Sequence, residues 1–504
     1  MYKGWKKLIA VCVSVSLFIS TIPPVFATSS DNEPQSSIRS DDILYELDEM
    51  RDTYTKVFRL RNGNNLAYIS SAPIHYQENE EWKDIDNTLQ LDETTDTYTN
   101  LQNDIQISLP QQMDAQAEVS IEKDNYSVSF QLLGSPSPAV AETEPTQLQN
   151  VQVQAQAAEP SADILDFISE ENLYAEMEYK EVFDDIDLTY QVQPSSLKEE
   201  LVLGSRPQNQ LTFSFAIHCA GLTPVLEEDN SISFYQADTD EVLFVMPTPV
   251  MFDAADDPVY SSDIDVTLVQ TDNAYQLNLT PSFAWLTDNE RKYPVSVDPT
   301  IMDPEAVVQD TYITQTSPDK NYNTWSSLKM GKKSYALFRP VVNGWIDDGA
   351  RIENVKLYIK THSSVPNTLC EAYPITSQWN YQTVTWNTMP TINTTAILDA
   401  TELKDNAYCT LDISRIYREN NGFHLSYGVA LMGRYATSDA TLFSTESITP
   451  DTQPFVTVEF RNTTGINNSY AQRQFNMGRA GIVYLNDYTG NLSLKRSDIG
   501  VDGL

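Results

Sequence analysis

Short runs in which apolar and polar residues alternate recur along the whole chain, and this period of two constrains the fold more than any other feature. The clearest runs are 119–121, 126–132, 211–217, 266–268 and 456–460. Successive side chains of a strand point to opposite faces, so each run has one apolar face to bury. The pattern predicts a mainly β protein with two β-sandwich-like modules joined by linkers.

The first 27 residues have the pattern of a signal peptide. Three lysines precede an apolar stretch over residues 8–22, and Val25-Phe26-Ala27 places small residues where a signal peptidase cleaves. No later stretch approaches the ~18 apolar residues of a membrane span. We therefore expect cleavage after Ala27, no membrane insertion afterwards, and a secreted protein that is extracellular or associated with the cell wall.

Charge divides the remaining chain. Residues 28–300 hold 51 acidic and 12 basic side chains, whereas residues 301–461 hold 17 and 13. The formal net charge of −39 predicts that nucleic acid is not a partner, because both molecules would be anionic. We expect an acidic β-rich module over residues 28–300, and the Pro-, Ala-, Gln- and Glu-rich stretch near 134–162 predicts a flexible insertion within it.

Residues 301–461 carry an ordered series of motifs that resembles the DNRLRE-type β-sandwich, a family of carbohydrate-binding modules in exported bacterial proteins. The motifs are Gln309-Asp310-Thr311-Tyr312-Ile313, Leu328-Lys329-Met330-Gly331, Tyr335-Ala336-Leu337-Phe338-Arg339, Val384-Thr385-Trp386-Asn387 and Tyr427-Gly428-Val429-Ala430-Leu431. The resemblance implies a complete sandwich that binds a glycan, and we expect this segment to fold by itself.

The flanking regions resemble another family, the bacterial wall-associated Rhs/YD-repeat proteins. The likeness rests on residues 58–63, on 81–87, on Tyr293-Pro294 through Thr300, and on Gly478 through Leu492. It implies that the chain corresponds to the N-terminal part of such a protein, with residues 462–504 as the start of a truncated repeat region. A separate YD-repeat polypeptide is then an expected partner.

Flat aromatic rings beside amide groups are the residue types that bind sugars, because the rings stack on apolar sugar faces. Four aromatic residues in segments rich in Asn, Gln and Thr are the candidate glycan contacts: Tyr322, Trp325, Trp345 and Tyr381. Trp325 and Trp345 lie beside Asn and Gly in predicted loops and are the preferred pair. Trp379 and Trp386 are expected in the core.

No cofactor is expected, except that a structural calcium ion would take oxygen ligands from Asp310, Asp412 and Glu446 near predicted strand ends. Three cysteines follow the signal peptide, and Cys370 and Cys409 are the candidates for a disulfide within the second sandwich. Their odd number argues against a disulfide scaffold.

The sequence lacks the His-Glu-x-x-His, Gly-x-Ser-x-Gly and phosphate-loop signatures. We therefore expect a protein that is not an enzyme and that binds an exported polysaccharide or a cell-wall glycan. Two alternatives remain at this point. The chain is a docking or delivery piece of a contact-dependent toxin system, or its acidic region is a glycan-cleaving enzyme with an attached binding module.

Overall fold

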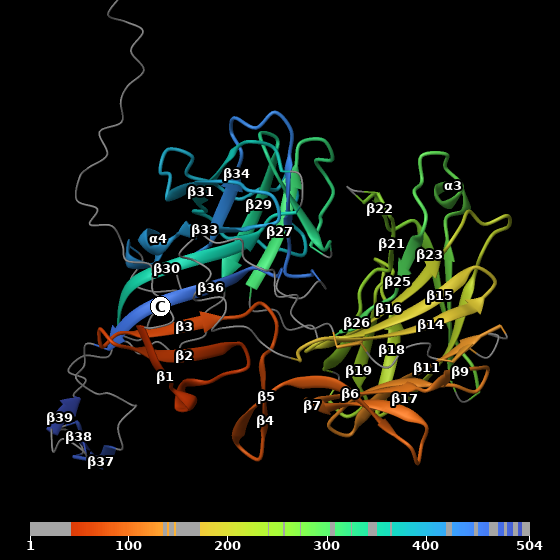
Figure 1. Ribbon diagram of the computed structural model, residues 1–504, viewed down its shortest axis with the longest axis horizontal. Helices are drawn as coiled ribbons and strands as arrows, with labels where there is room; N and C mark the ends of the chain where they lie inside the picture. The colour runs from red at the N-terminus through yellow and green to blue at the C-terminus, as the bar shows by residue number, and fades with distance from the viewer. Residues whose placement is uncertain are drawn as a thin grey trace, which may run out of the picture.

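The computed structural model describes sixteen segments of the chain, two of which are dipeptides. They are residues 42–134, 139–140, 146–147, 172–239, 241–255, 258–272, 274–302, 308–323, 325–340, 350–362, 365–419, 426–447, 452–462, 472–477, 481–486 and 492–495. Two β-sandwiches lie side by side, and a small third sheet stands apart (Figure 1). The predicted mainly β fold is confirmed. The expected signal peptide over residues 1–27 lies outside the described residues.

The first sandwich is made from one continuous part of the chain. Its eight-stranded sheet has the order β23 (Ile264–Gln270), β24 (Tyr275–Pro281), β17 (Phe213–Ala220), β11 (Tyr126–Leu133), β10 (Val119–Lys123), β8 (Ile105–Pro110), β7 (Thr97–Gln102) and β6 (Asp86–Asp92). A short helix, α3 (Phe283–Leu286), follows β24.

An eleven-stranded sheet faces the first one. Its main path is β13 (Thr146–Gln147), β14 (Ala175–Phe183), β15 (Ile186–Val192), β16 (Ser196–Leu203), β26 (Ile301–Met302), β20 (Val242–Met246), β19 (Ile232–Gln236) and β18 (Leu222–Leu226), with β25 (Val295–Asp298), β21 (Val250–Asp253) and β22 (Tyr260–Ser261) branching from β16. Alternate residues of both sheets, such as Phe215 and Leu201, meet in one apolar core.

The hairpin of β10 and β11 shows how the sequence pattern becomes this structure. Val119 pairs with Phe130 and Ile121 with Val128, so the apolar members of both strands share one buried face. Asp124 in the connecting turn adopts a positive φ of 56°, a conformation that Asp and Asn accept more readily than most residues. The two alternating runs therefore form one hairpin with a single buried face, as their period of two predicts.

The second sandwich packs a six-stranded sheet against a five-stranded one. The six-stranded sheet has the order β1 (Ile43–Glu46), β2 (Thr55–Leu60), β3 (Asn65–Ile69), β36 (Phe455–Asn462), β30 (Ala350–Lys360) and β33 (Tyr408–Asp412). The five-stranded sheet has the order β27 (Val308–Thr314), β29 (Ser334–Pro340), β34 (Val429–Met432), β31 (Leu369–Pro374) and β32 (Asp399–Glu402).

Smaller elements complete the second sandwich. These are the 3₁₀ helix η2 (Asp48–Met50), the helix α4 (Ser414–Glu419), the pair β28 (Ser327–Met330) and β35 (Ala440–Phe443), and the hairpin β4 (His75–Glu78) and β5 (Glu81–Asp84). Gly428 has a φ of +84°, and a Cβ atom on it would lie 1.9 Å from the carbonyl oxygen of Phe338. Only glycine therefore lets the chain enter β34 this close to β29.

Strands β1 to β3 place the start of the chain in the second sandwich. Residues Asn65 to Ile69 pair with Phe460 to Val456, and Val57, Ala67 and Ile69 are buried in the core between the two sheets. The predicted boundaries instead assign these strands to the acidic module over residues 28–300. The structure differs because alternation marks a strand without naming its partner, which here comes from the opposite end of the chain.

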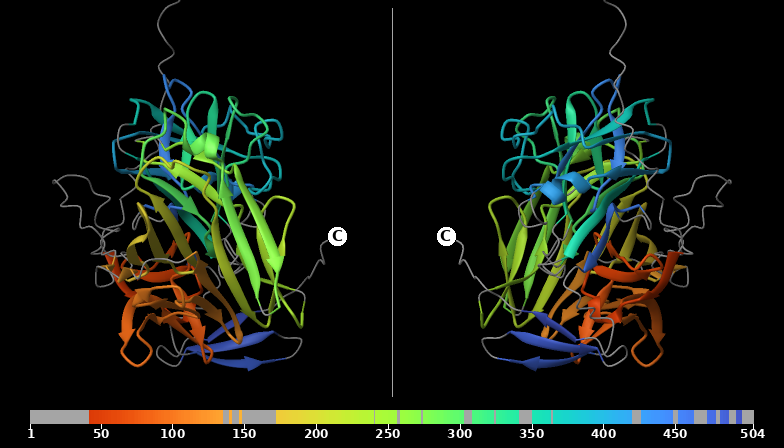
Figure 2. Two further views of the ribbon diagram at one scale, coloured as in Figure 1. Left: turned by 90° about the vertical axis from the view of Figure 1, so that its right-hand side faces the viewer. Right: turned by 90° about the vertical axis from the view of Figure 1, so that its left-hand side faces the viewer.

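The other predicted segments have mixed outcomes. Within the expected insertion near 134–162, β12 (Ala139–Val140) pairs with β9 (Gln112–Met113), β13 pairs with β14, and most other residues lie outside the described part. In the region 462–504, β37 (Gln472–Asn476), β38 (Ile482–Asn486) and β39 (Leu492–Lys495) form a separate sheet that leaves Phe475, Leu492 and Leu494 exposed. Figure 2 shows this sheet at the bottom of the molecule in both views, level with the lowest orange strands. No helix in the described ranges is long and apolar enough to span a bilayer.

Candidate functional site

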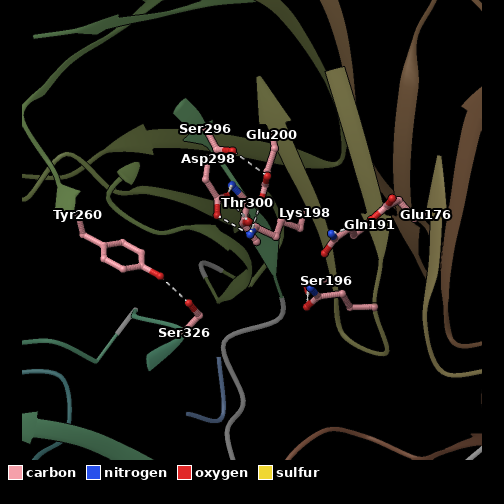
Figure 3. A network of polar contacts seen from close by, with 11 residues as sticks. Glu176, Gln191, Ser196, Lys198, Glu200, Tyr260, Ser296, Asp298, Thr300 and Ser326 are labelled. Carbon is pink, nitrogen blue, oxygen red and sulfur yellow. Dashed lines mark hydrogen bonds and ion pairs between the residues drawn. The ribbon is translucent and has the colours of Figure 1, made fainter. Parts of the chain in front are cut away.

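The two sandwiches meet at an aromatic stack, and this junction contains several of the residues singled out from the sequence. Tyr260 of β22 stacks on Trp325, with ring centroids 4.5 Å apart and an interplanar angle of 28°. The Tyr260 hydroxyl lies 2.8 Å from Oγ of Ser326 (Figure 3). One tyrosine thus supplies both an apolar and a polar contact between the sandwiches.

Further rings surround Trp325. Its edge contacts Tyr322 at 4.6 Å and Tyr312 at 6.1 Å between centroids, and Nζ of Lys320 lies 4.5 Å from its centroid. Burial lowers the pKa of Lys320, whereas its cation–π contact with the rings favours the charged ammonium group. Because these rings and Lys320 contact Trp325, its side chain packs between the two sandwiches. It does not form the open platform that its loop composition predicted.

An ion network lies beside this stack in the first sandwich. Lys198 of β16 pairs with Asp298 at 3.1 Å and with Glu200, which also accepts a 3.1 Å hydrogen bond from Oγ of Ser296 (Figure 3). The Asp298 carboxylate also accepts from the backbone N–H of Thr300 at 3.1 Å. Because the two carboxylates flank it, the pKa of Lys198 is raised despite burial.

Two carboxyl groups of the second sandwich reach the same region, and neither forms an ion pair with a cation among the described residues. Asp310 of β27 is 2% exposed and accepts from the N–H of Thr445 at 2.8 Å and from its hydroxyl at 3.0 Å. Burial raises the pKa of Asp310 to about 8, and burial raises that of Glu446 to about 7 with a further contribution from the charge of Asp298. The pKa of Asp310 thus lies above neutral pH, whereas Glu446, with a pKa of about 7, is about half ionised there.

The residues predicted to bind a glycan or calcium do not come together in one site. Tyr322 is 5% exposed and belongs to the core, Tyr381 is half-buried against a cluster that includes Trp379, and Trp345 lies outside the described residues. Asp412 lies apart from the other two calcium candidates and accepts instead from the N–H of Ser414 at 2.8 Å. The described residues contain no group of three or more His, Cys, Asp or Glu side chains placed to hold a metal ion.

The expected disulfide is not formed. Cys370 of β31 and Cys409 of β33 are both free thiols, buried between facing sheets of the second sandwich. Contact with the Cys409 thiol and burial raise the pKa of Cys370 well above its usual value. The sequence offered these two cysteines as candidates for a disulfide, and in this structure their thiols are in contact without a bond.

The residues that sequence reasoning missed are Glu371 on β31 of the five-stranded sheet and Arg434 and Tyr435 in the loop that follows β34. Tyr435 is 80% exposed, and its neighbour Arg434 donates to the hydroxyl of Tyr373 at 3.1 Å. Glu371 is buried beside them with one oxygen lacking a hydrogen-bond partner. The available signal was Gly433-Arg434-Tyr435 directly after an apolar strand, which places an aromatic ring and a guanidinium in one tight loop.

Comparison with protein families now bears on the second sandwich. Residues 303–459 match the model of Carbohydrate-binding module family 96. The match begins at the strands of the five-stranded sheet and ends within β36. The likeness of this region to a carbohydrate-binding module is confirmed, whereas the DNRLRE assignment stays a prediction.

Comparison with individual proteins reaches further along the chain. This chain is 26% identical over 484 residues to a protein named tRNA3(Ser)-specific nuclease WapA of Bacillus spizizenii. It is 25% identical over 483 residues to tRNA nuclease WapA of Bacillus subtilis strain 168. Each alignment covers 85% of this chain but 19% of the relative, so the chain spans about one fifth of their length.

These names correct one expectation. The absence of catalytic signatures led to the prediction that the protein is not an enzyme, yet these relatives and a third from Bacillus subtilis subsp. natto are all named tRNA nucleases. The expectation rested on the absence of three catalytic signatures, and that absence does not exclude a catalytic site of another kind.

Proposed function

We propose that the second sandwich binds a polysaccharide or cell-wall glycan and thereby holds an exported, WapA-like protein at the outside of the cell. The observation that carries this proposal is the family match over residues 303–459, which coincides with most of one closed sandwich. The first sandwich then serves as a rigid, acidic partner attached through the Tyr260–Trp325 stack.

Charge favours a particular mode of binding. The second sandwich, residues 42–85 together with 301–461, holds 26 acidic and 18 basic side chains, whereas residues 86–300 of the first hold 39 and 6. Anionic wall polymers are repelled by the first sandwich, so contacts to the second sandwich depend on ring stacking and hydrogen bonds. Binding should therefore change little with salt, because exposed charge pairs are the contacts that ions screen.

The test is a binding measurement on the purified 504-residue chain. Immobilised peptidoglycan, teichoic acids and a panel of neutral and acidic oligosaccharides are incubated with it at 50 mM and 500 mM salt. Retention on at least one glycan at both salt concentrations is expected. No retention on any of them, or retention that disappears at 500 mM salt, would contradict the proposed mode.

The names of the relatives favour tRNA cleavage as a second candidate function. We test it by incubating the chain with total tRNA and separating the products by denaturing electrophoresis. Discrete fragments would assign the activity to this chain, whereas intact tRNA at equimolar protein would contradict that assignment. A reducing-sugar assay on the glycan panel tests the glycan-cleaving alternative in the same preparation.

A further inference from the structure

The outer face of the five-stranded sheet in the second sandwich is only partly covered. Alternate residues of β31 divide between its two faces: Cys370 and Ala372 enter the core, while Leu369, Glu371 and Tyr373 face outward. The loop over residues 375–392 covers the Tyr373 end, and Leu369 at the other end is 45% exposed. Glu371 therefore lies at the border of the cover.

The Glu371 carboxylate is incompletely satisfied. In the strand register the residue lies opposite Met432 on β34 and Ala400 on β32, and it is 8% exposed. Its Oε2 atom has no hydrogen-bond partner among the described residues. The carboxylate also interacts with the Tyr373 hydroxyl, and its remaining oxygen is open to a donor from a ligand, because buried acceptors without a donor are costly.

Arg434 lies directly beyond this carboxylate, two residues after Met432 on the same side of the chain. It donates from one terminal nitrogen to the Tyr373 hydroxyl, and its Cζ lies 5.8 Å from the Tyr373 ring centroid. Because Tyr373 is 1% exposed, the guanidinium is anchored to the fixed part of the sheet. The remaining N–H donors of the guanidinium suit hydroxyl or ring oxygens.

Tyr435 adds an open ring to these polar groups. At 80% exposure it is the most exposed of the large hydrophobic residues described, although it follows Arg434 directly in a loop anchored at both strands. A ring left in water at this position gains contact area only by stacking on a ligand. Tyrosine is well suited to this because the ring loses little conformational entropy on binding.

We propose that Tyr435, Arg434 and Glu371 form a subsite for a neutral pyranose unit of the bound glycan. The ring takes the apolar sugar face, Glu371 accepts from hydroxyls and Arg434 donates to them. This proposal rests on the proposed glycan-binding function and names its place and ligand class. Uronic acids are disfavoured, because Glu371 and the nearby Glu402, which pairs with Leu369, place two carboxylates against one guanidinium.

The experiment measures binding of the intact chain to chitohexaose, cellohexaose and oligogalacturonate by titration calorimetry. Tyr435→Ala should weaken binding of the neutral oligosaccharide about 5- to 10-fold, and Glu371→Gln should weaken it by at least about threefold. Tyr45→Ala is the matched control, because Tyr45 is a 48% exposed tyrosine on edge strand β1 of the other sheet. Its affinity should stay within twofold of the wild type.

The outcomes separate the two proposals. Equal neutral-sugar affinities in the wild type and Tyr435→Ala overturn the subsite and leave glycan binding intact. Binding of oligogalacturonate alone overturns the neutral ligand class. A wild-type chain that binds no glycan of the wider panel overturns the proposed function itself. Since Tyr435 is exposed, thermal unfolding of Tyr435→Ala should match the wild type, so misfolding does not imitate the expected loss.

Discussion

The two sandwiches differ in how the chain closes them and in how they treat buried charge. The first is built from consecutive residues, and its buried lysine and arginine, Lys198 and Arg291, pair with carboxylates. The second joins segments whose side chains meet 395 residues apart, as in the hydrogen bond from Asn64 to Glu459, and keeps Asp310 without a cation among the described residues. The difference shows that similar architectures here depend on different stabilising contacts.

The largest expected effect concerns closure. A fragment of residues 301–461 loses Leu47, Tyr54, Val57 and Ile69 from its core. At about 1.5–3 kcal/mol for each buried side chain, this loss is comparable with the whole stability of a typical domain. We expect no cooperative thermal transition for this fragment by calorimetry, in contrast to the expectation from sequence that it folds alone.

A synthetic peptide of residues 43–74 provides the complementary test. Adding it to the 301–461 fragment should restore a cooperative transition, because β3 can pair with β36 again. Residues 86–302, expressed alone, should unfold cooperatively without any addition. If residues 301–461 alone melt at the temperature of the intact chain, the second sandwich does not need strands β1 to β3 for its stability.

The second effect sharpens the contrast in buried charge. Replacing Lys198 with Ala leaves Glu200 and Asp298 facing each other without a cation, which should cost about 3–5 kcal/mol in unfolding free energy. Lys180→Ala is the matched control, since Lys180 also contacts two carboxylates but is 38% exposed, and it should cost less than about 1 kcal/mol. Urea titrations measure both, and equal losses would contradict the assignment.

The third effect is the pH dependence of the unfolding free energy that the buried carboxyl groups with raised pKa values cause. The pKa values of Asp310 and Glu446 are raised to about 8 and about 7, and burial raises that of Glu199 in the first sandwich to about 8. Between pH 5 and 8 the folded chain thus holds protons that the unfolded chain has released. The free energy of unfolding should fall as pH rises through this window.

We expect the midpoint temperature of thermal unfolding to drop by several degrees between pH 5 and pH 8.5. Asp310→Asn keeps a neutral group at the site and should flatten this slope, whereas Asp265→Asn on exposed strand β23 should leave it unchanged. A melting temperature that rises over the same range would show that the carboxyl groups ionise in the folded state at little cost.

The smallest effect concerns the stack between the sandwiches. Tyr260→Ala removes the ring that packs on Trp325 and should cost about 1 kcal/mol, while Tyr260→Phe keeps the ring and loses only the contact to Ser326. Differential scanning calorimetry should show the two sandwiches melting further apart in Tyr260→Ala than in Tyr260→Phe. Identical traces for both variants would assign the coupling to other contacts.

Local structure followed from the sequence where neighbours in the chain determine it. The 119–132 hairpin was predictable because its turn and both apolar faces are contained in fourteen residues, and Trp379 was predictable as a core residue. The pairing of β3 with β36 was not, because alternation carries no information about remote partners. Trp325 was misjudged for the same reason, since its covering ring, Tyr260, comes from the other sandwich.

The pairing of β3 with β36 also has a consequence for biogenesis. Strands β2 and β3 leave the ribosome long before residues 455–462 are made, so the β3 edge stays unpaired while the whole first sandwich is synthesised. An unpaired apolar edge invites wrong pairing between chains. Folding of the newly made chain therefore competes with aggregation until the last strand is complete, and early folding of the first sandwich shortens the distance that the two paired segments must search.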